Sequence, residues 1–124
     1  TYGVYNNSSS PTMTNVIASA SGGTNNTYGV YNNSSSPTIQ NSRISAIGET
    51  NNYGIYNSAD GSSFTVRVNN SQITGSTNTI RNDAEFTVRV GASLLNGGPV
   101  AGGGGFTCVG AYDENYAALN ATCL

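Results

Sequence analysis

The sequence of 124 residues contains no lysine, no histidine and no tryptophan, and charged side chains make up only 8% of it. Without histidine there is no Ser–His or Cys–His catalytic pair, and without lysine there is no lysine base or Schiff base. Four arginines against six acidic residues give a formal net charge of −2, so the chain offers no basic footprint for nucleic acid. No apolar run approaches the roughly 20 residues that span a bilayer, and we expect no membrane insertion.

Leucine is also scarce, which excludes a leucine-rich repeat. It occurs only at Leu94, Leu95, Leu119 and Leu124. The hydrophobic fraction of 36% is below the usual globular share, while Asn, Ser, Thr and Gly dominate. The apolar residues that are present are mostly β-branched or aromatic and recur in register, which favours ordered strands over disorder.

An internal repeat organises what remains. The segment TYGVYNNSSSPT occupies residues 1–12 and returns unchanged at residues 27–38. A third copy begins at Tyr53, a fourth survives at Ile80, and the pentapeptide at residues 64–68 recurs at residues 86–90. Periods in the twenties are typical of solenoids. We predict about four coils over residues 1–96, with repeats that start near residues 1, 27, 53 and 80, and expect further coils before Thr1.

Each coil contains three short pieces of alternating polarity that are separated by polar corners. In the first coil these pieces are Tyr2–Asn6, Thr12–Thr14 and Val16–Ala20. Three strands per turn predict an all-β, three-sided parallel β-helix with almost no α-helix, and the general rule for parallel crossovers makes it right-handed. The predicted core consists of Val4, Val30, Ile55, Ile80, Ile39, Ile44, Ile73, Phe64, Phe86, Val66 and Val88.

Asparagines recur at two positions of the repeat. Asn15, Asn41 and Asn70 each end the second strand, and asparagine tolerates the left-handed backbone of a sharp corner. A second set should form a hydrogen-bonded ladder from coil to coil, as amide side chains do in other stacked sheets. This set consists of Asn6, Asn32, Asn57 and Asn82.

The pattern YGVYNNSSSPTIQNSRI resembles the pectin-lyase-like right-handed parallel β-helices, including repeat proteins of exported bacterial origin. The resemblance covers Thr1 to about Asn96 and implies the fold, because such coils serve lyases, hydrolases, adhesins and phage tail spikes alike. The lyases of this family use calcium-binding aspartates with a basic residue. The residues of this chain that could correspond to these aspartates and to the basic residue are Asp60, Asp83, Arg67 and Arg89.

Residues 97–124 depart from the repeat and are predicted to form a connector and a cap. The glycine-rich stretch 97–105 reads as a looping connector, Phe106–Tyr112 as a last strand, and Asp113 as the cap of a short helical turn over Asn115–Leu119. Phe106 and Leu119 should cover the terminal coil, because a solenoid end exposes core and strand edges.

The two cysteines, Cys108 and Cys123, both lie in this cap. A disulfide between them would close a loop of about 15 residues and contribute roughly 3 kcal/mol in the chain-entropy model. With no histidine and only two thiols, we expect no zinc site. A disulfide implies an oxidising setting, so the predicted location is extracellular or on the cell surface.

Three carboxylates are the candidates for chemistry. Asp60 and Glu85 occupy equivalent positions under a 25-residue offset, with Asp83 nearby. Two carboxyls about 5–5.5 Å apart on stacked coils would suit a retaining glycosidase. We expect no cofactor, and calcium bound by these carboxylates is the alternative. The other interpretation is that these are solvated loop charges that balance Arg67 and Arg89.

An aromatic strip is the candidate binding surface. If the aliphatic set points inward, then Tyr5, Tyr31, Tyr56 and Arg81 form an outward column. Stacked tyrosines stabilise a sheet face, and a flat aromatic strip also suits sugar rings or a partner subunit. Arg67 and Arg89 form a neighbouring strip. The predicted partners are a glycan or cell-surface polymer and further copies of the chain in a trimer or filament.

Two functional classes follow from these features. The first is a non-catalytic extracellular β-solenoid of a cell-surface, appendage or fibre protein, which serves as a rigid, adhesive or self-assembling element. The alternative is a carbohydrate-active fragment, either a polysaccharide lyase or hydrolase or a glycan-binding module. A threonine-faced ice binder is a third hypothesis. Thr12, Thr38, Thr65 and Thr87 are expected to align for it, but their outward partners Thr14, Gln40, Arg67 and Arg89 spoil a regular lattice.

Overall fold

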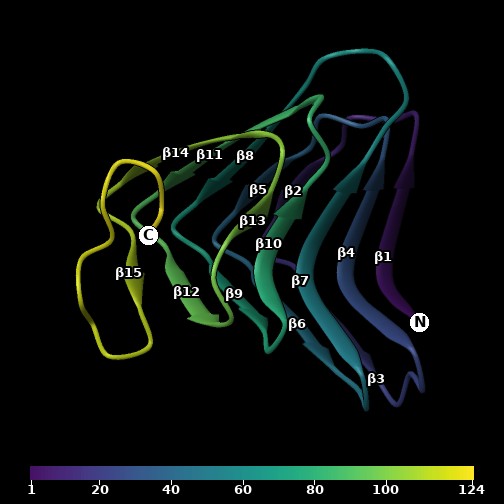
Figure 1. The fold of residues 1–124 in the computed structure, drawn as a ribbon, viewed down its shortest axis with the longest axis horizontal. Helices are drawn as coiled ribbons and strands as arrows, with labels where there is room; N and C mark the ends of the chain where they lie inside the picture. Colours follow the sequence, from purple (N-terminus) through teal and green to yellow (C-terminus); the bar gives the residue numbers. More distant parts are fainter.

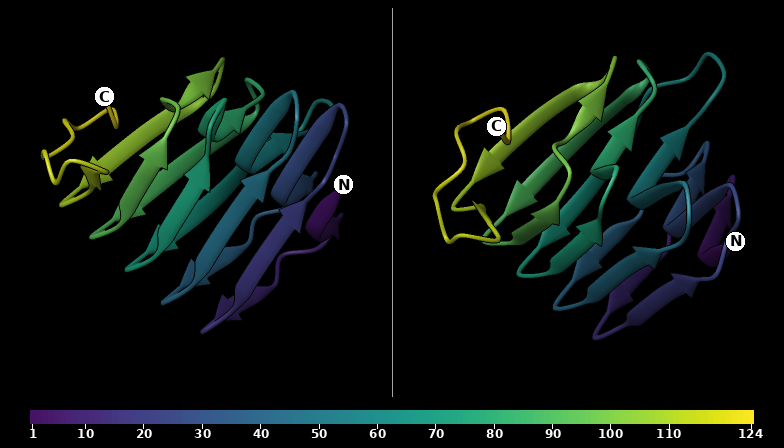
Figure 2. Two further views of the ribbon diagram at one scale, coloured as in Figure 1. Left: turned by 90° about the horizontal axis from the view of Figure 1, so that it is seen from below. Right: turned by 60° about the horizontal axis from the view of Figure 1, so that its bottom comes forward.

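The computed structural model describes residues 1–124 and contains fifteen strands and no helix (Figure 1). Each turn of the chain adds one strand to each of three parallel sheets of five strands. The first and last residues lie at opposite ends of the stack (Figures 1 and 2). The prediction of an all-β, three-sided parallel β-solenoid is therefore confirmed. None of its secondary structure is a long apolar helix of the kind that crosses a membrane.

The three sheets are named A, B and C in the order in which the chain visits them. Sheet A contains, in stacking order, β1 (Tyr2–Asn7), β4 (Asn26–Asn33), β7 (Asn51–Ser58), β10 (Asn78–Asn82) and β13 (Ala101–Gly102). Sheet B contains β2 (Thr12–Thr14), β5 (Thr38–Gln40), β8 (Phe64–Asn69), β11 (Phe86–Gly91) and β14 (Gly105–Val109). Sheet C contains β3 (Ile17–Ser21), β6 (Arg43–Ile47), β9 (Gln72–Gly75), β12 (Leu94–Gly97) and β15 (Tyr112–Asp113).

The core is a set of aliphatic columns that run along the axis of the solenoid. Val30, Ile55 and Ile80 occupy paired positions on β4, β7 and β10 and are fully buried. All eleven residues predicted for the core belong to it, with Val4 and Phe64 partly buried against the rest. Val68 and Val90, which the prediction omitted, are buried as well. Burial of a Val or Ile side chain contributes about 1.5–3 kcal/mol, so these columns are the main source of stability.

The corner between sheets B and C requires a left-handed backbone in every coil. Asn15, Asn41 and Asn70 have φ values of 57°, 49° and 46°, as predicted for asparagine at a sharp corner. In the fourth coil Ala92 takes the same position with a φ of 43°. Alanine has no side-chain amide to bond the backbone there, so the repeat geometry alone holds it in this conformation.

A column of buried serines follows directly after these corner residues. The Ser71 hydroxyl donates to the Asn69 carbonyl at 2.8 Å and accepts the Ser42 backbone N–H at 3.1 Å. Ser42 and Ser93 make the equivalent bonds in their own coils. Each hydroxyl therefore satisfies one carbonyl of its own coil and one N–H of the preceding coil, which ties the corners together.

The predicted asparagine ladder is present inside the corner between sheets A and B. Asn6 donates to Asn32 at 2.8 Å, Asn32 to Asn57 at 2.7 Å, and Asn57 to Asn82 at 2.6 Å. All four side chains are buried. The ladder ends at Asn82, whose Nδ2 has no partner because Gly102 occupies the next position in the sheet.

One part of the predicted register is wrong. Thr38 was expected to align with Thr65, but it pairs with Arg67, and Ile39 pairs with Val68. The corner residues Asn41 and Asn70 are stacked by a side-chain hydrogen bond across 29 residues, which fixes the register from the end of the strand. The segment FTV of β8 consequently extends the strand towards the preceding corner, which is occupied by serines and Pro37 in the second coil.

The C-terminal part also differs from the prediction. The glycine-rich stretch is not only a connector, because β13 pairs with β10 and begins a short fifth rung with β14 and β15. No helical turn forms at residues 115–119. Asp113 instead accepts the backbone N–H groups of Asn115 and Ala117, both at 2.9 Å, and Tyr116 has a left-handed φ of 61°. These features make a tight polar turn rather than a helix.

The disulfide between Cys108 and Cys123 is confirmed, with 5.2 Å between the two Cα atoms. Both cysteines are buried in the core, and Phe106 and Leu119 pack against it. The Cys108 N–H donates to Ala121 at 2.9 Å, so the last residues lie along the free edge of β14. The C-terminal segment thus covers one end of the solenoid, as Figure 2 shows.

The buried asparagine ladder gives a first prediction. Asn57→Ala leaves the donor of Asn32 and the acceptor of Asn82 unpaired in the core, so we expect the free energy of unfolding to fall by about 3 kcal/mol. Asn33→Ala is the matched control, because it removes one exposed amide hydrogen bond to Asn7 and should cost less than about 1 kcal/mol. Urea unfolding measures both values. Equal losses in the two variants would show that the ladder contributes nothing specific.

The disulfide gives a second prediction. It closes a loop across 15 residues, and the chain-entropy model assigns such a loop about 3 kcal/mol. Reduction should therefore lower the Tm of the wild-type protein by about 10 °C. The Cys108→Ala/Cys123→Ala variant should melt near the reduced wild type and should not respond to reductant. A wild-type Tm that is unchanged by complete reduction would contradict the prediction.

Candidate interaction surfaces

Two columns of tyrosines, rather than one, cover the outward side of sheet A. Tyr5, Tyr31 and Tyr56 occupy paired positions on β1, β4 and β7, and Arg81 takes the next position on β10. Tyr2, Tyr28 and Tyr53 form a second column in the same way. Together these six tyrosines are called the tyrosine face. The structure thus aligns the column that the sequence singled out and adds a second one.

Glycines explain why both columns point outward although they are three residues apart. Strict alternation places Gly3 on the outer side with Tyr5, and this expectation is wrong. A Cβ built on Gly29 would lie 2.6 Å from the Ile44 Cγ2 in the core. Thr27 and Val30 are both fully buried, so alternation is interrupted at the glycine between them. The signal was present in the sequence as Tyr-Gly-Val-Tyr, because an isolated glycine in a strand marks a close backbone approach.

The rings of the tyrosine face form a regular lattice. Within a column they stack, with Tyr28 and Tyr53 centroids 5.5 Å apart at 16° and Tyr31 and Tyr56 centroids 5.3 Å apart at 13°. Between columns they meet edge to face, as Tyr28 and Tyr31 do at 5.0 Å and 85°. Such pairs contribute about 0.5–1.5 kcal/mol each beyond their buried area. Both geometries recur in the inner coils, whereas Tyr5, at the end of the face, is tilted by 36° against Tyr31 and by 50° against Tyr2.

Exposure varies along the tyrosine face. Tyr2 and Tyr5 on the first strand are 53% and 51% exposed, whereas Tyr28 is only 9% exposed because rings flank it on both sides. Desolvation by these neighbours raises the pKa of Tyr28 and of Tyr31 above the ordinary value of 10.0, and the phenolate charges of adjacent tyrosines add to the increase. Tyr28 and Tyr31 are therefore uncharged at neutral pH. Because stacking covers the planes of the inner rings, the face presents ring edges and hydroxyl groups.

Sheet B carries the second predicted strip. Arg67 and Arg89 are paired neighbours on β8 and β11 and are both exposed. They line a hollow of about 310 Å³, here called the arginine groove, together with Asn69, Val90, Gly91, Thr107 and Val109. Because Arg67 follows Thr38 in the column, the continuous threonine row required by the ice-binding hypothesis is interrupted.

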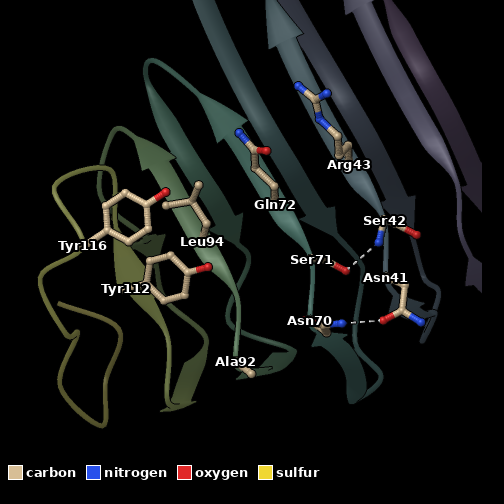
Figure 3. A pocket seen from close by; sticks show the side chains of 10 residues that line it. All are labelled: Asn41, Ser42, Arg43, Asn70, Ser71, Gln72, Ala92, Leu94, Tyr112 and Tyr116. Carbon is tan, nitrogen blue, oxygen red and sulfur yellow. Dashed lines mark hydrogen bonds between the residues drawn. The ribbon is translucent and has the colours of Figure 1, made fainter.

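A second hollow, of about 460 Å³, lies on sheet C beside the C-terminal segment (Figure 3). Tyr112 and Tyr116 stand at one end of it, with ring centroids 5.4 Å apart and planes 13° apart, and Arg43 stands at the other end. Between them lie Gln72 and Leu94. This hollow presents a single stacked pair of rings, in contrast to the six rings of sheet A. No sequence pattern predicts this hollow, because Tyr116 reaches it through a C-terminal turn outside the repeat.

The candidate carboxylates do not form a metal-binding cluster. Asp60 is exposed in the loop between β7 and β8, which is the projecting teal loop in Figure 1, whereas Asp83 and Glu85 lie in the shorter loop between β10 and β11. The Glu85 carbonyl accepts the Phe64 N–H at 2.9 Å, so Glu85 lies level with the end of the Asp60 loop. No group of three acidic, histidine or cysteine side chains in the chain is arranged to hold a metal ion.

Comparison with known proteins gives no further assignment: no family model, no curated protein and no solved structure matches the chain. Its candidate sites therefore have to be judged from their own geometry.

The raised tyrosine pKa values give a third prediction. Well below pH 10 the Tyr28 and Tyr31 phenols are neutral in the folded and unfolded chains, and the stability that they contribute is fully present. As the pH rises through 10.0, the unfolded chain ionises first, so the free energy of unfolding falls until the folded tyrosines ionise as well. Urea unfolding between pH 8 and pH 11 should show this decline.

Tyr28→Phe and Tyr31→Phe keep the stacked rings but remove the phenols that are harder to ionise, so each should reduce the decline. Tyr116→Phe, which alters a tyrosine that is 79% exposed, is the control for removing a phenol from the surface. If the free energy of unfolding declines above pH 10 as steeply in Tyr28→Phe and Tyr31→Phe as in the wild type, the tyrosine face does not cause the decline.

Proposed function

We propose that this chain is a non-catalytic, extracellular β-solenoid module of a cell-surface, appendage or fibre protein, and that its tyrosine face binds a glycan. The observation that carries the proposal is the continuity of the six tyrosine rings over three coils, five of them stacked and Tyr5 tilted against Tyr31. The tyrosine face exposes apolar ring edges beside polar hydroxyls, which matches a sugar ring with its apolar C–H face and hydroxyl rim. The module acts as a rigid spacer that presents this surface.

Repetition gives the tyrosine face its binding strength. Equivalent rings recur at the strand spacing of about 4.8 Å, so a linear polymer that contacts one coil can contact the next without a further loss of translational freedom. Weak contacts then sum to a useful avidity. The asparagines and serines of the adjacent corner, among them Asn7, Asn33 and Ser58, supply hydrogen-bonding groups next to the rings. A neutral polysaccharide fits this chemistry best.

The disulfide supports an oxidising, extracytoplasmic location, because such bonds persist where thiols are not kept reduced. Within the parallel β-solenoids, the finer assignment to the pectin-lyase-like type rests on the sequence resemblance. The absence of histidine and lysine leaves few groups for general acid or base work near pH 7, chiefly the carboxylates. None of the hollows of the molecule is lined by Asp60, Asp83 or Glu85, which favours binding over cleavage.

The fourth prediction tests the tyrosine face with a panel of neutral and charged polysaccharides in affinity electrophoresis. Tyr5→Ala removes an exposed ring and Tyr31→Ala a central one, and we expect each to weaken binding of a neutral polysaccharide about tenfold, with the larger effect at Tyr31. Tyr31→Phe should retain most of the binding, because it keeps the ring. Tyr116→Ala, in the sheet C hollow, is the matched control and should bind as the wild type does.

Two results would overturn the proposal. The first is unchanged binding in Tyr5→Ala and Tyr31→Ala, or a loss confined to Tyr116→Ala, which would move the site to sheet C. The second is cleavage of a polysaccharide by the wild type that disappears in Asp60→Asn or Asp83→Asn, because this would make the chain an enzyme. Sedimentation velocity on the same variants reports whether the tyrosine face instead joins copies of the chain into trimers or filaments.

A further inference from the structure

The arginine groove lies on sheet B, a different side of the solenoid from the tyrosine face, and contains an unfavourable arrangement of charge. Arg67 and Arg89 are directly paired on adjacent strands, which places their backbones about 4.8 Å apart. Like charges at directly opposite positions of a sheet destabilise it. A bound anion would therefore relieve the repulsion between the two guanidinium groups.

No side chain of the protein is placed to supply that anion. The neighbours of the pair in its own column are Thr38 on one side and Thr107 on the other. Along β11 the next residues on the same face are Thr87 and Gly91. The nearest carboxylate in that part of the chain, Glu85, stands four residues before Arg89, which is about 13 Å along an extended strand.

The other acidic residues are also remote from this face. They lie in the loops between sheets or in the C-terminal turn, at Glu49, Asp60, Asp83, Asp113 and Glu114. The outward positions of the groove are instead neutral and hydrogen-bonding, namely Asn69 and Thr107, with Val109 as an exposed apolar wall. Two cations thus share a hollow with donors and no acceptor of opposite charge.

We propose that the arginine groove binds a tetrahedral oxyanion, that is, a phosphate or sulfate group. A planar carboxylate offers two oxygens, and a single guanidinium fork occupies both. A tetrahedral group has further oxygens directed out of that plane, so it can be held by both guanidinium groups at once and accept from the Thr107 hydroxyl. A phosphate monoester with a charge near −2 at neutral pH also balances the two arginines.

This site is independent of the tyrosine face, because it lies on another sheet and recognises charge rather than an apolar ring. It does not rest on the proposed function. If both surfaces act, a polymer that carries phosphate or sulfate groups can engage sheet B while a neutral glycan engages sheet A.

Nuclear magnetic resonance of the arginine Nε–H groups tests the site, with inorganic phosphate and inorganic sulfate titrated at constant ionic strength maintained with sodium chloride. We expect saturable shifts at Arg67 and Arg89 and at the Thr107 amide. Arg67→Gln and Arg89→Gln, which keep a polar chain of similar shape without the charge, should each weaken binding at least tenfold. Arg43→Gln, which alters an exposed arginine on sheet C, is the matched control and should leave the affinity unchanged.

The same variants show whether the pair is merely structural. Without added oxyanion, Arg67→Gln should be at least as stable to urea as the wild type, because it removes a like-charge neighbour. With sulfate, the wild type should gain more stability than Arg67→Gln. Sulfate also stabilises proteins in general, but this effect is the same for both proteins and drops out of the difference between them. Methyl phosphate and methyl sulfate, whose charges at neutral pH are near −2 and −1, separate the two ester classes. Tighter binding of methyl phosphate would identify a phosphate monoester as the ligand class, and the reverse order would identify a sulfate ester.

Three outcomes would overturn the inference. One is shifts that rise without saturation or that persist in Arg67→Gln and Arg89→Gln. Another is acetate binding as tightly as sulfate, since this removes the argument for a tetrahedral group. The last is a large loss of stability in anion-free Arg67→Gln compared with Arg43→Gln, which would show that the arginines hold the sheet together.

Discussion

Stacking in register is the constraint on which the rest of this structure depends. Every strand pairs in parallel with its equivalent in the next coil, so each side chain lies above one at the matching position. Inside the solenoid this produces columns of Val and Ile and the ladder of asparagines. A slip of one residue would exchange the inner and outer faces of each strand and break every amide pair of the ladder. The buried amides therefore specify the register as well as contributing stability.

The same constraint acts on the surface, where it repeats whatever the sequence places there. On sheet A it repeats aromatic rings, which attract one another and build the tyrosine face. On sheet B it repeats arginine, which repels its own copy. One stacking rule thus gives a self-stabilised surface on one side and, on another, a surface that an external anion would stabilise. The two sides consequently differ in the chemistry they offer to partners.

Much of the fold could be predicted because the same short sequence pattern recurs in successive coils. A pattern that is a weak indication of structure in one copy becomes a strong one when it is repeated at matching intervals. A single Tyr-Gly-Val-Tyr segment says little, but three copies at matching intervals identify a solenoid, its inward valines and isoleucines, and its asparagine ladder. The asparagine corners follow from the residue type, because asparagine adopts a left-handed backbone readily. Ala92 was beyond prediction for the same reason, since alanine carries no such preference.

The errors arose where the spacing changes or where alternation fails. Corner residues Asn41 and Asn70 are 29 residues apart, whereas the serines that follow Asn70 and Ala92 are 22 apart. Thr38 and Thr65 are two residues closer in sequence than the corner spacing of 29 requires, so their expected alignment was wrong. The second tyrosine column was missed because alternation was applied through Gly3, although the backbone turns inward at that position. The sheet C hollow depends on a C-terminal turn that belongs to no repeat.

The direction of the backbone hydrogen bonds has a mechanical consequence. They run from coil to coil, along the axis that joins the two ends of the chain (Figure 1). Tension applied between those ends therefore pulls along the bonds and loads one coil at a time, so that the chain unwinds from an end instead of shearing as a whole. At the C-terminal end the disulfide locks residues 108–123 into a closed loop that force cannot lengthen. Extension should then proceed through the coils that no disulfide crosses and should release the rings of the tyrosine face one coil at a time.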